Sequence, residues 1–103
     1  MATYKAEVGW EALGDSSRLA IVRSLAERPR AVGELADELP ITRQAVSQHL
    51  KVLKSAGLVT DRAEGTRRVY QLNPAGLAAL KDQIDTFWRR ALDGYQQTVE
   101  EDK

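Results

Sequence analysis

The sequence contains no cysteine and only one histidine, His49. Without thiols the chain can form no disulfide, no thiolate nucleophile and no zinc or iron–sulfur site built on cysteine. A single histidine also excludes a histidine cluster. The best candidates for metal ligands are the carboxylates of Asp82 and Asp85. Two carboxylates on one exposed helix face, however, more often provide only solvating charge. We therefore expect no metal and no cofactor.

Long apolar runs are missing as well. No segment approaches the roughly 18 apolar residues that a membrane span needs, and residues 1–10 lack the apolar core of a secretion signal. With 103 residues, 43% hydrophobic and 29% charged, the chain has the size and composition of one small folded domain. We expect a single domain over residues 1–103 that is cytoplasmic and does not contact a membrane.

The formal net charge is zero, but the charges are unevenly distributed. Residues 41–70 carry 6 basic and 2 acidic side chains, whereas the segments on either side each carry an excess of acidic ones. Because salt screens charges beyond roughly 8 Å, a local basic segment can attract a polyanion even in a neutral protein. The alternative is a solvated surface without a ligand.

Helix signals dominate the first half of the chain. Residues 8–28 predict two helices, a short one that ends at Gly14 and a second one with Asp15 as its N-cap. Pro29 ends the second helix. A third predicted helix covers residues 33–39 and ends at Pro40, and it forms the first half of a helix-turn-helix over residues 33–55.

The next predicted helix is the most informative one. It begins after Thr42, its expected N-cap, runs from Arg43 to about Ser55 and ends at Gly57. Val46, Leu50 and Leu53 share one face of this helix, and a polar face lies opposite. Polar side chains on an α-helix of this kind can read base edges in the major groove of DNA. We assign base contacts to Gln44, Ser47 and Gln48, and phosphate contacts to Thr42, Arg43 and Lys51; the alternative is an ordinary surface helix.

Residues 58–72 predict a β-hairpin that follows this helix directly. Two strand-like segments, residues 58–62 and 67–72, flank a turn that contains Gly65. Arg62, Arg67 and Arg68 could bind DNA beside the major-groove site. Because side chains alternate along a strand, Arg67 and Arg68 point to opposite faces, so at most one of them faces the DNA. The alternative for each arginine is a solvated or ion-paired side chain.

A long helix is predicted over residues 75–95, followed by a polar, frayed tail over residues 96–103. The helix carries a wide apolar stripe. This stripe exceeds what one small domain can cover, which favours a second copy as its partner, and an intramolecular core is the alternative. The residues that we assign to the dimer interface on this helix are Leu77, Leu80, Ile84, Phe87, Trp88, Ala91 and Tyr95, and Leu92 broadens the stripe.

Four segments together resemble the ArsR family of bacterial winged-helix repressors. They are residues 12–19 (ALGDSSRL), 32–36 (VGELA), 44–59 (QAVSQHLKVLKSAGLV) and 65–72 (GTRRVYQL). The resemblance covers residues 8–95 and implies a mainly α fold with a small β-hairpin, a winged helix-turn-helix. It also implies a homodimer formed through the N- and C-terminal helices, with Trp10 at the interface, that binds a palindromic operator in double-stranded DNA.

The sequence departs from the family pattern in two respects. Residues 33–39 contain no cysteine and the last helix contains no histidine, so the metal-sensing sites of the family's metal sensors are absent. Ala31 also stands where Ser or Thr would complete a capping box with Glu34. The first departure argues against metal sensing and leaves the effector undetermined, and the second leaves the expected fold intact.

His49 lies at the edge of the packed face of the DNA-reading helix. The usual explanation for such a residue is a half-buried histidine bonded to a backbone group, whereas the family resemblance implies a phosphate contact. Catalysis by Ser47 and His49 is not expected, because residues i and i+2 of a helix do not face each other.

The sequence therefore predicts a DNA-binding transcriptional regulator. The most favoured form is a homodimeric repressor that binds a palindromic operator. The family resemblance also implies regulation of its own gene. The alternative is a winged helix that binds a protein partner through its polar helix face. An enzyme is not expected, since the chain has no nucleophile–base pair and no phosphate-binding glycine loop.

Overall fold

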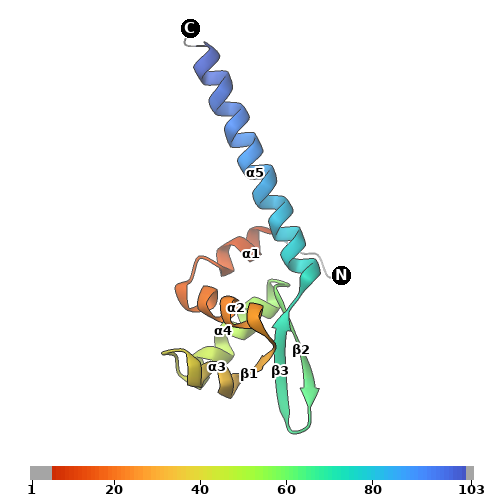
Figure 1. Ribbon diagram of the computed structural model, residues 1–103. Helices are drawn as coiled ribbons and strands as arrows, with labels where there is room; N and C mark the ends of the chain where they lie inside the picture. Colours follow the sequence, from red (N-terminus) through yellow and green to blue (C-terminus); the bar gives the residue numbers. More distant parts are fainter. Residues whose placement is uncertain (1–5, 102–103) are drawn as a thin grey trace.

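The computed structural model describes the backbone of residues 6–101 and the side chains of residues 9–98. It consists of five helices and one small sheet within this part of the chain (Figure 1). The predicted fold class, mainly α with a β-hairpin, is confirmed. The elements are α1 (Ala6–Ala12), α2 (Ser16–Glu27), β1 (Arg30–Ala31), α3 (Val32–Glu38), α4 (Arg43–Ser55), β2 (Val59–Glu64), β3 (Arg67–Leu72) and α5 (Pro74–Glu101).

The helix boundaries follow the predicted capping residues. The Asp15 carboxylate accepts hydrogen bonds from the backbone N–H groups of Ser17 and Arg18 at 2.9 and 3.1 Å. Thr42 Oγ1 accepts from the N–H of Ala45 at 3.1 Å and starts α4. Gly57, directly after the end of α4, has a φ of 79°, a conformation that costs glycine little and a residue with a Cβ more. These local signals fix the position of α4 in the chain.

The core lies where the helices α2, α3 and α4 meet the base of the hairpin. Its fully buried side chains come from one face of each element, as amphipathic segments of a small domain require. The largest of them are Ile21, Leu35, Val46, Leu50, Leu53, Leu58 and Val59. Leu80, near the start of α5, completes the cluster. The core thus holds α4 by its apolar face and leaves the opposite face free.

The sheet is antiparallel, with the strand order β1-β3-β2. The hairpin closes at the pair Glu64 and Arg67, and Gly65 in its turn has a φ of 64°. Strand β1 was not predicted. It has only two residues, and Ala31 pairs with Val69 of β3. This short strand joins the connection between α2 and α3 to β3. The hairpin of β2 and β3, which is the wing of the fold, is therefore attached to the helices through β1 as well as through the chain that leads from α4 into β2.

The last helix differs most from the prediction. A frayed tail was expected from residue 96, but α5 continues to Glu101 and is 28 residues long, or about 42 Å. The prediction of a tail is wrong for residues 96–101, because the polar side chains there have ordinary helix propensity and no proline interrupts the segment. Asp102 and Lys103 lie outside the described residues.

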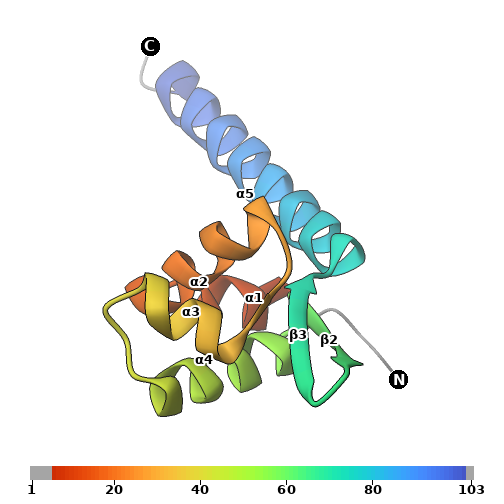
Figure 2. The same ribbon diagram turned by 60° about the horizontal axis from the view of Figure 1, so that its bottom comes forward.

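The C-terminal half of α5 extends beyond the remainder of the domain (Figures 1 and 2). The radius of gyration of 17.2 Å exceeds the roughly 13 Å of a compact domain of 100 residues. Within residues 6–101, none of the helices combines the length and the hydropathy that a membrane span requires.

Candidate nucleic-acid interface

Helices α3 and α4 are the two helices of a helix-turn-helix. They pack against each other through Leu35, Val46 and Leu50, and the connection between them is only Leu39 to Thr42. Figure 2 shows α4 along the lower edge of the domain, with the hairpin of β2 and β3 beside its C-terminal end. This places an exposed helix face and a wing next to each other.

The predicted base-reading residues, Gln44, Ser47 and Gln48, lie on the exposed face of α4, which we call the reading face. The side chains of Gln44, Ser47 and Gln48 are all exposed, whereas Val46 and Leu50 are fully buried. Among the described residues no hydrogen-bond partner is found for these three polar side chains. Their amide and hydroxyl groups can therefore donate to and accept from a ligand without breaking a contact within the subunit.

The predicted phosphate contacts surround this face. Lys51 is exposed one turn after Ser47, and Thr42 is exposed at the N-terminus of α4. The Arg43 side chain lies back over the start of α3, where its Nη2 atom would be 3.0 Å from a Cβ built on Gly33. A glycine at position 33 leaves room for this guanidinium between the two helices.

The three arginines of the wing are exposed and form ion pairs in the free subunit. Arg62 donates a hydrogen bond to Gln71 at 2.8 Å. Arg67 reaches Glu34 of α3 at 3.3 Å, and Arg68 reaches Asp61 at 3.0 Å. The partners of Arg67 and Arg68 differ, as expected for side chains on opposite faces of a strand. The pair between Arg67 and Glu34 is partly exposed to solvent, and such ion pairs are worth little free energy, so a phosphate can replace the Glu34 carboxylate at small cost.

Asp61 joins the wing to α4 and was not singled out from the sequence. Its carboxylate is only 8% exposed and lies 2.8 Å from Lys54 Nζ at the end of α4 and 3.0 Å from the Arg68 guanidinium. The hydrogen bond from Lys54, together with that from Arg68, holds the pKa of Asp61 below its usual value. One carboxylate therefore fixes both strands of the hairpin to the helix that carries the reading face.

Asp61→Asn is expected to destabilise the protein at neutral pH and to have less effect under acid conditions. Because the pKa of Asp61 is lower in the folded protein, its contribution to stability is present above the unfolded value of about 3.9 and is lost as the pH falls through the folded value. Urea unfolding at pH 7 and at pH 3 measures this difference. Glu64→Gln, which removes an exposed carboxylate on the same hairpin, should change little at either pH; an equal effect of both substitutions would contradict the assignment.

His49 is half-buried, as expected, but its partner differs from the expected one. The Nδ1 atom of the ring lies 3.4 Å from Nη1 of Arg18 on α2, and not beside a backbone group. The sequence separation of 31 residues hides this contact from any local pattern. The structure leaves the ring partly exposed at the edge of the reading face.

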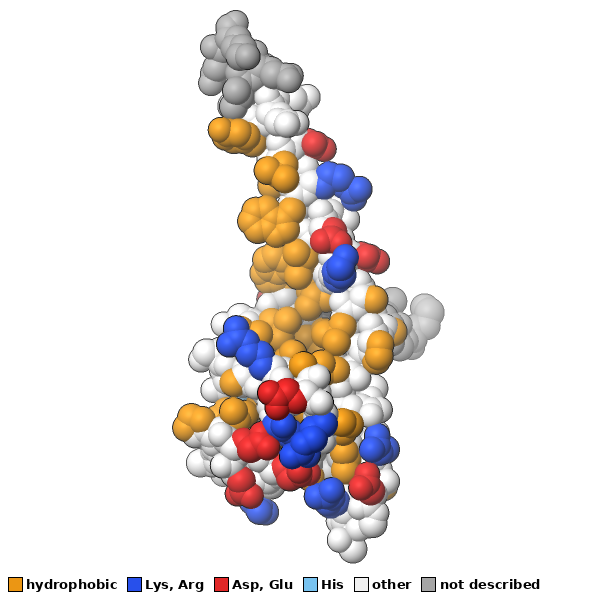
Figure 3. All heavy atoms as spheres, in the orientation of Figure 1, with side chains coloured by type: hydrophobic (Ala, Val, Ile, Leu, Met, Phe, Trp, Pro, Cys, Tyr) orange, Lys and Arg blue, Asp and Glu red, His pale blue; other side chains and the backbone are white. Residues whose placement is uncertain are grey.

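The predicted dimer residues divide into two groups. Leu80 is buried in the core of its own subunit, and Leu77 and Ile84 pack against that core. For these three residues the intramolecular alternative is the observed position, since the first turns of α5 pack against α1. The other predicted residues lie on the surface: Ala91 is exposed, and Trp10, Phe87, Trp88 and Tyr95 are about half exposed or more, as is Leu92, which was assigned only to the stripe. Figure 3 shows hydrophobic side chains one after another along one side of the part of α5 that is drawn in colour.

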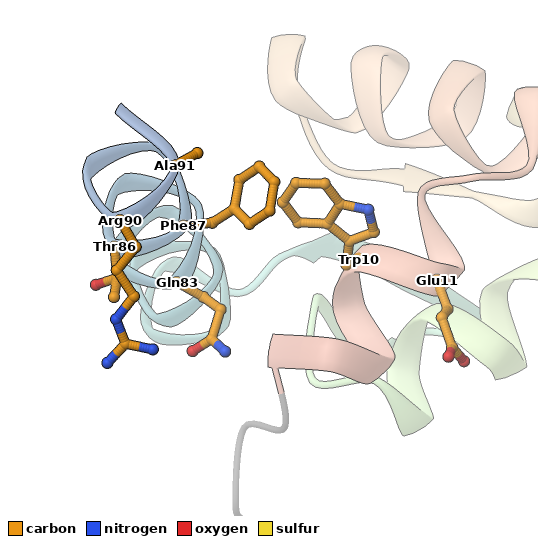
Figure 4. Close-up of a pocket in the computed structure, with 7 residues that line it drawn as sticks. All are labelled: Trp10, Glu11, Gln83, Thr86, Phe87, Arg90 and Ala91. Atoms are coloured by element: carbon orange, nitrogen blue, oxygen red, sulfur yellow. The ribbon is translucent and has the colours of Figure 1, made fainter. Parts of the chain in front are cut away.

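A groove between α1 and α5 opens at the base of this apolar face. It has a volume of about 740 Å³ and contains aromatic rings from both helices, with Trp10 and Phe87 facing each other at 5.8 Å between ring centroids (Figure 4). Phe87 in turn lies 5.5 Å from Trp88. The face therefore continues from α1 onto the free half of α5.

Asp82 and Asp85 do not form part of a metal-binding cluster. Asp85 pairs with Lys81 at 2.8 Å on the exposed side of α5. Across the part of the chain that the structure describes, no group of three His, Asp or Glu side chains is placed to hold a metal ion.

Comparison with known proteins agrees with this geometry. The model of the family described as "Bacterial regulatory protein, arsR family" matches residues 15–61, which include α2, α3 and α4. The HTH-type transcriptional regulator Rv2034 of Mycobacterium tuberculosis is 60% identical over 101 residues, and the match covers 97% of this chain and 94% of that protein. The arsenical resistance operon repressor of Bacillus subtilis is 32% identical over 92 residues, covering 87% of this chain and 88% of the repressor.

A solved structure shares the fold. The solution structure of the homodimeric winged helix-turn-helix DNA-binding domain Mb0332 from Mycobacterium bovis superposes with a TM-score of 0.65 at 36% identity, over 82% of this chain and 77% of that one. Together with the near full-length match to Rv2034, this settles the family. The chain belongs to the arsR family of bacterial regulatory proteins, and it is a winged helix-turn-helix transcriptional regulator.

Proposed function

We propose that this regulator is a homodimeric repressor that binds a pseudo-palindromic operator through α4 and the wing. The observation that carries the proposal is the face of α4. Its polar side chains Gln44, Ser47 and Gln48 are exposed and have no partner among the described residues, and the basic hairpin lies beside it. A 13-residue helix is about 20 Å long and fits the major groove of B-DNA, which is about 12 Å wide.

The side chains around this face have different roles in the proposed complex. Gln44, Ser47 and Gln48 contact base edges, because amide and hydroxyl groups supply both donors and acceptors. Charged and capping residues contact phosphates and fix the register of the helix on the duplex. The proposed phosphate contacts are the N-cap Thr42 with Arg43, His49 and Lys51 on α4, and on the wing Arg62 with Arg67 in preference to Arg68, whose guanidinium points to the opposite face of β3 and is bound to Asp61.

The apolar face of α1 and α5 supplies the proposed dimer contact. Trp10, Phe87, Trp88, Leu92 and Tyr95 form an exposed patch that a monomer would leave in water. The homodimeric state of the M. bovis domain supports a second copy as the occupant. A two-fold dimer presents two α4 helices, so the half-site centres should lie 34 to 36 Å apart, or a multiple of that distance.

In this proposal the dimer represses transcription because it occupies promoter DNA. A dimer of this size that covers promoter DNA excludes RNA polymerase from the same segment. The B. subtilis relative that is named an operon repressor supports this direction of control.

Salt-dependent DNA binding tests the proposed function. The protein is titrated onto a duplex from the region upstream of its own gene and onto other promoter fragments. We expect the affinity to fall by about 10³-fold or more between 50 and 200 mM salt, because cations are released from each neutralised phosphate. If no fragment binds at about 50 mM salt, the reading face serves a protein partner instead.

Gln48→Ala and Arg67→Ala should separate base recognition from phosphate binding. Loss of a Gln48 base contact is expected to reduce discrimination between operator and mismatched DNA by about 1–3 kcal/mol, whereas Arg67→Ala should weaken all sequences about equally and lower the salt slope. Competition binding with single-base operator variants measures the first effect and a salt titration the second. Unchanged discrimination by Gln48→Ala would refute our assignment of the reading face.

A further inference from the structure

The Arg18 side chain is held in place by α1 and α2. Its Nε atom donates a hydrogen bond to the backbone carbonyl of Ala12 at 2.8 Å, at the end of α1. Its Nη2 atom lies 3.9 Å from Asp15 Oδ2, and Asp15 is itself bound by two backbone N–H groups as the N-cap of α2. The side chain of Arg18 is only 21% exposed. These two contacts hold the Nε and Nη2 atoms of the guanidinium and so fix the direction in which its third nitrogen, Nη1, points.

The Nη1 atom of Arg18 faces the imidazole ring of His49. Nη1 of Arg18 lies 3.4 Å from Nδ1 of the imidazole. A guanidinium carries only donors, so Nδ1 can complete the contact only as an acceptor. A neutral imidazole whose Nδ1 accepts must carry its proton on Nε2.

The proton on Nε2 matters for DNA because phosphate oxygens only accept hydrogen bonds. In the ring, Nε2 points away from Nδ1 and hence away from Arg18. The residue is partly exposed beside Gln48, and no partner for Nε2 is found in the described structure. In the other tautomer, Nε2 would present a lone pair to the phosphate and make no hydrogen bond.

We propose that Arg18 is a positioning residue that holds His49 in the tautomer with the proton on Nε2, ready to donate to a DNA phosphate. Arg18 acts through His49 and does not itself touch the duplex. The phosphate contact rests on the proposed function, but the tautomer of the free protein does not. The two parts can therefore be tested separately.

The tautomer is measured first, without DNA. Because the chain has one histidine, long-range nitrogen–proton spectra of the 15N-labelled protein under mildly alkaline conditions report on His49 alone. We expect the pattern of an imidazole protonated at Nε2 in the wild-type protein, and a shift toward a mixture of tautomers in Arg18→Met. A wild-type spectrum with the proton on Nδ1, or with an even mixture, overturns the proposal even if Arg18→Met fails to fold.

The DNA contact is tested with two substitutions of His49. A glutamine can place an amide donor near the position of Nε2, whereas an asparagine reaches only as far as Nδ1. We expect His49→Gln to bind the operator fragment nearly as well as the wild type, and His49→Asn to bind about three- to tenfold more weakly, the loss of one hydrogen bond. Equal affinities of the two variants would overturn the phosphate contact.

A double-mutant cycle connects Arg18 to this contact. Arg18→Met should weaken binding by a similar factor when His49 is present, and by much less in a His49→Gln background, where no tautomer exists. Arg23→Met, which removes an exposed arginine from the same helix, controls for the loss of positive charge. Equal losses in both backgrounds would make Arg18 merely structural. Absence of DNA binding by the wild type would refute the proposed function and leave the tautomer to the spectra.

Discussion

Leu50→Ala is expected to lower the free energy of unfolding by about 2–5 kcal/mol, since it removes a fully buried side chain and leaves a cavity. Leu50 is 0% exposed and lies in the centre of the core, on the face of α4 that is opposite the polar residues. Small domains have only about 5–15 kcal/mol to lose. Denaturation by urea, followed by circular dichroism at a fixed protein concentration, measures the change.

Val52→Ala is the matched control for this substitution. Val52 belongs to the same helix but is 40% exposed, so the loss of its two methyl groups should cost under about 1 kcal/mol. A similar loss for both variants would mean that α4 is not held by its apolar face. In that case the orientation of the reading face would also be in doubt.

Helix α4 could be predicted from the sequence because its determinants are local. Thr42 supplies the N-cap, Gly57 supplies the residue with positive φ after the last turn, and Val46, Leu50 and Leu53 recur at helical spacing. Each of these signals acts over a few residues, and all of them agree. The exposure of Gln44, Ser47 and Gln48 then follows from the helical angle alone.

The contacts of the site could not be predicted in the same way, because they join distant parts of the chain. Glu34 and Arg67 are 33 residues apart, and Arg18 and His49 are 31 apart. Any of several acidic side chains could have paired with the wing arginines. Only the packing of α3 and the hairpin against each other through β1 selects Glu34 for Arg67, and β1 itself is too short to show a pattern.

The boundary between buried and exposed residues along the apolar stripe of α5 could not be predicted from the sequence either. Its periodicity predicts one continuous face from Leu77 to Tyr95, but not where the domain beneath that face ends. In the structure the boundary lies near Ile84, which still packs against the core, while Phe87 is 52% exposed. The division between core and free surface depends on how far α1 and the hairpin reach along the helix, a property of the tertiary fold.

Leu92→Glu is expected to convert the protein to a monomer and to reduce operator affinity by about 10²-fold or more. Leu92 is 60% exposed in the subunit, so the substitution leaves the core intact. In the proposed dimer the new carboxylate would lose its hydration without a partner, at a cost that a small interface cannot offset. Once the subunits separate, each α4 helix binds a half-site alone and the gain from linking two binding units is lost.

Gln97→Glu is the matched control, because it adds the same charge to the opposite side of α5. Sedimentation equilibrium gives the oligomeric state of each variant, and titration onto a full operator and onto an isolated half-site gives the affinities. We expect Gln97→Glu to stay dimeric and to prefer the full operator. Leu92→Glu should bind both duplexes with the same weak affinity per half-site. A Leu92→Glu protein that is still dimeric would show that the subunits meet elsewhere, and a monomeric one that still prefers the full operator would show that cooperation between half-sites does not depend on this face.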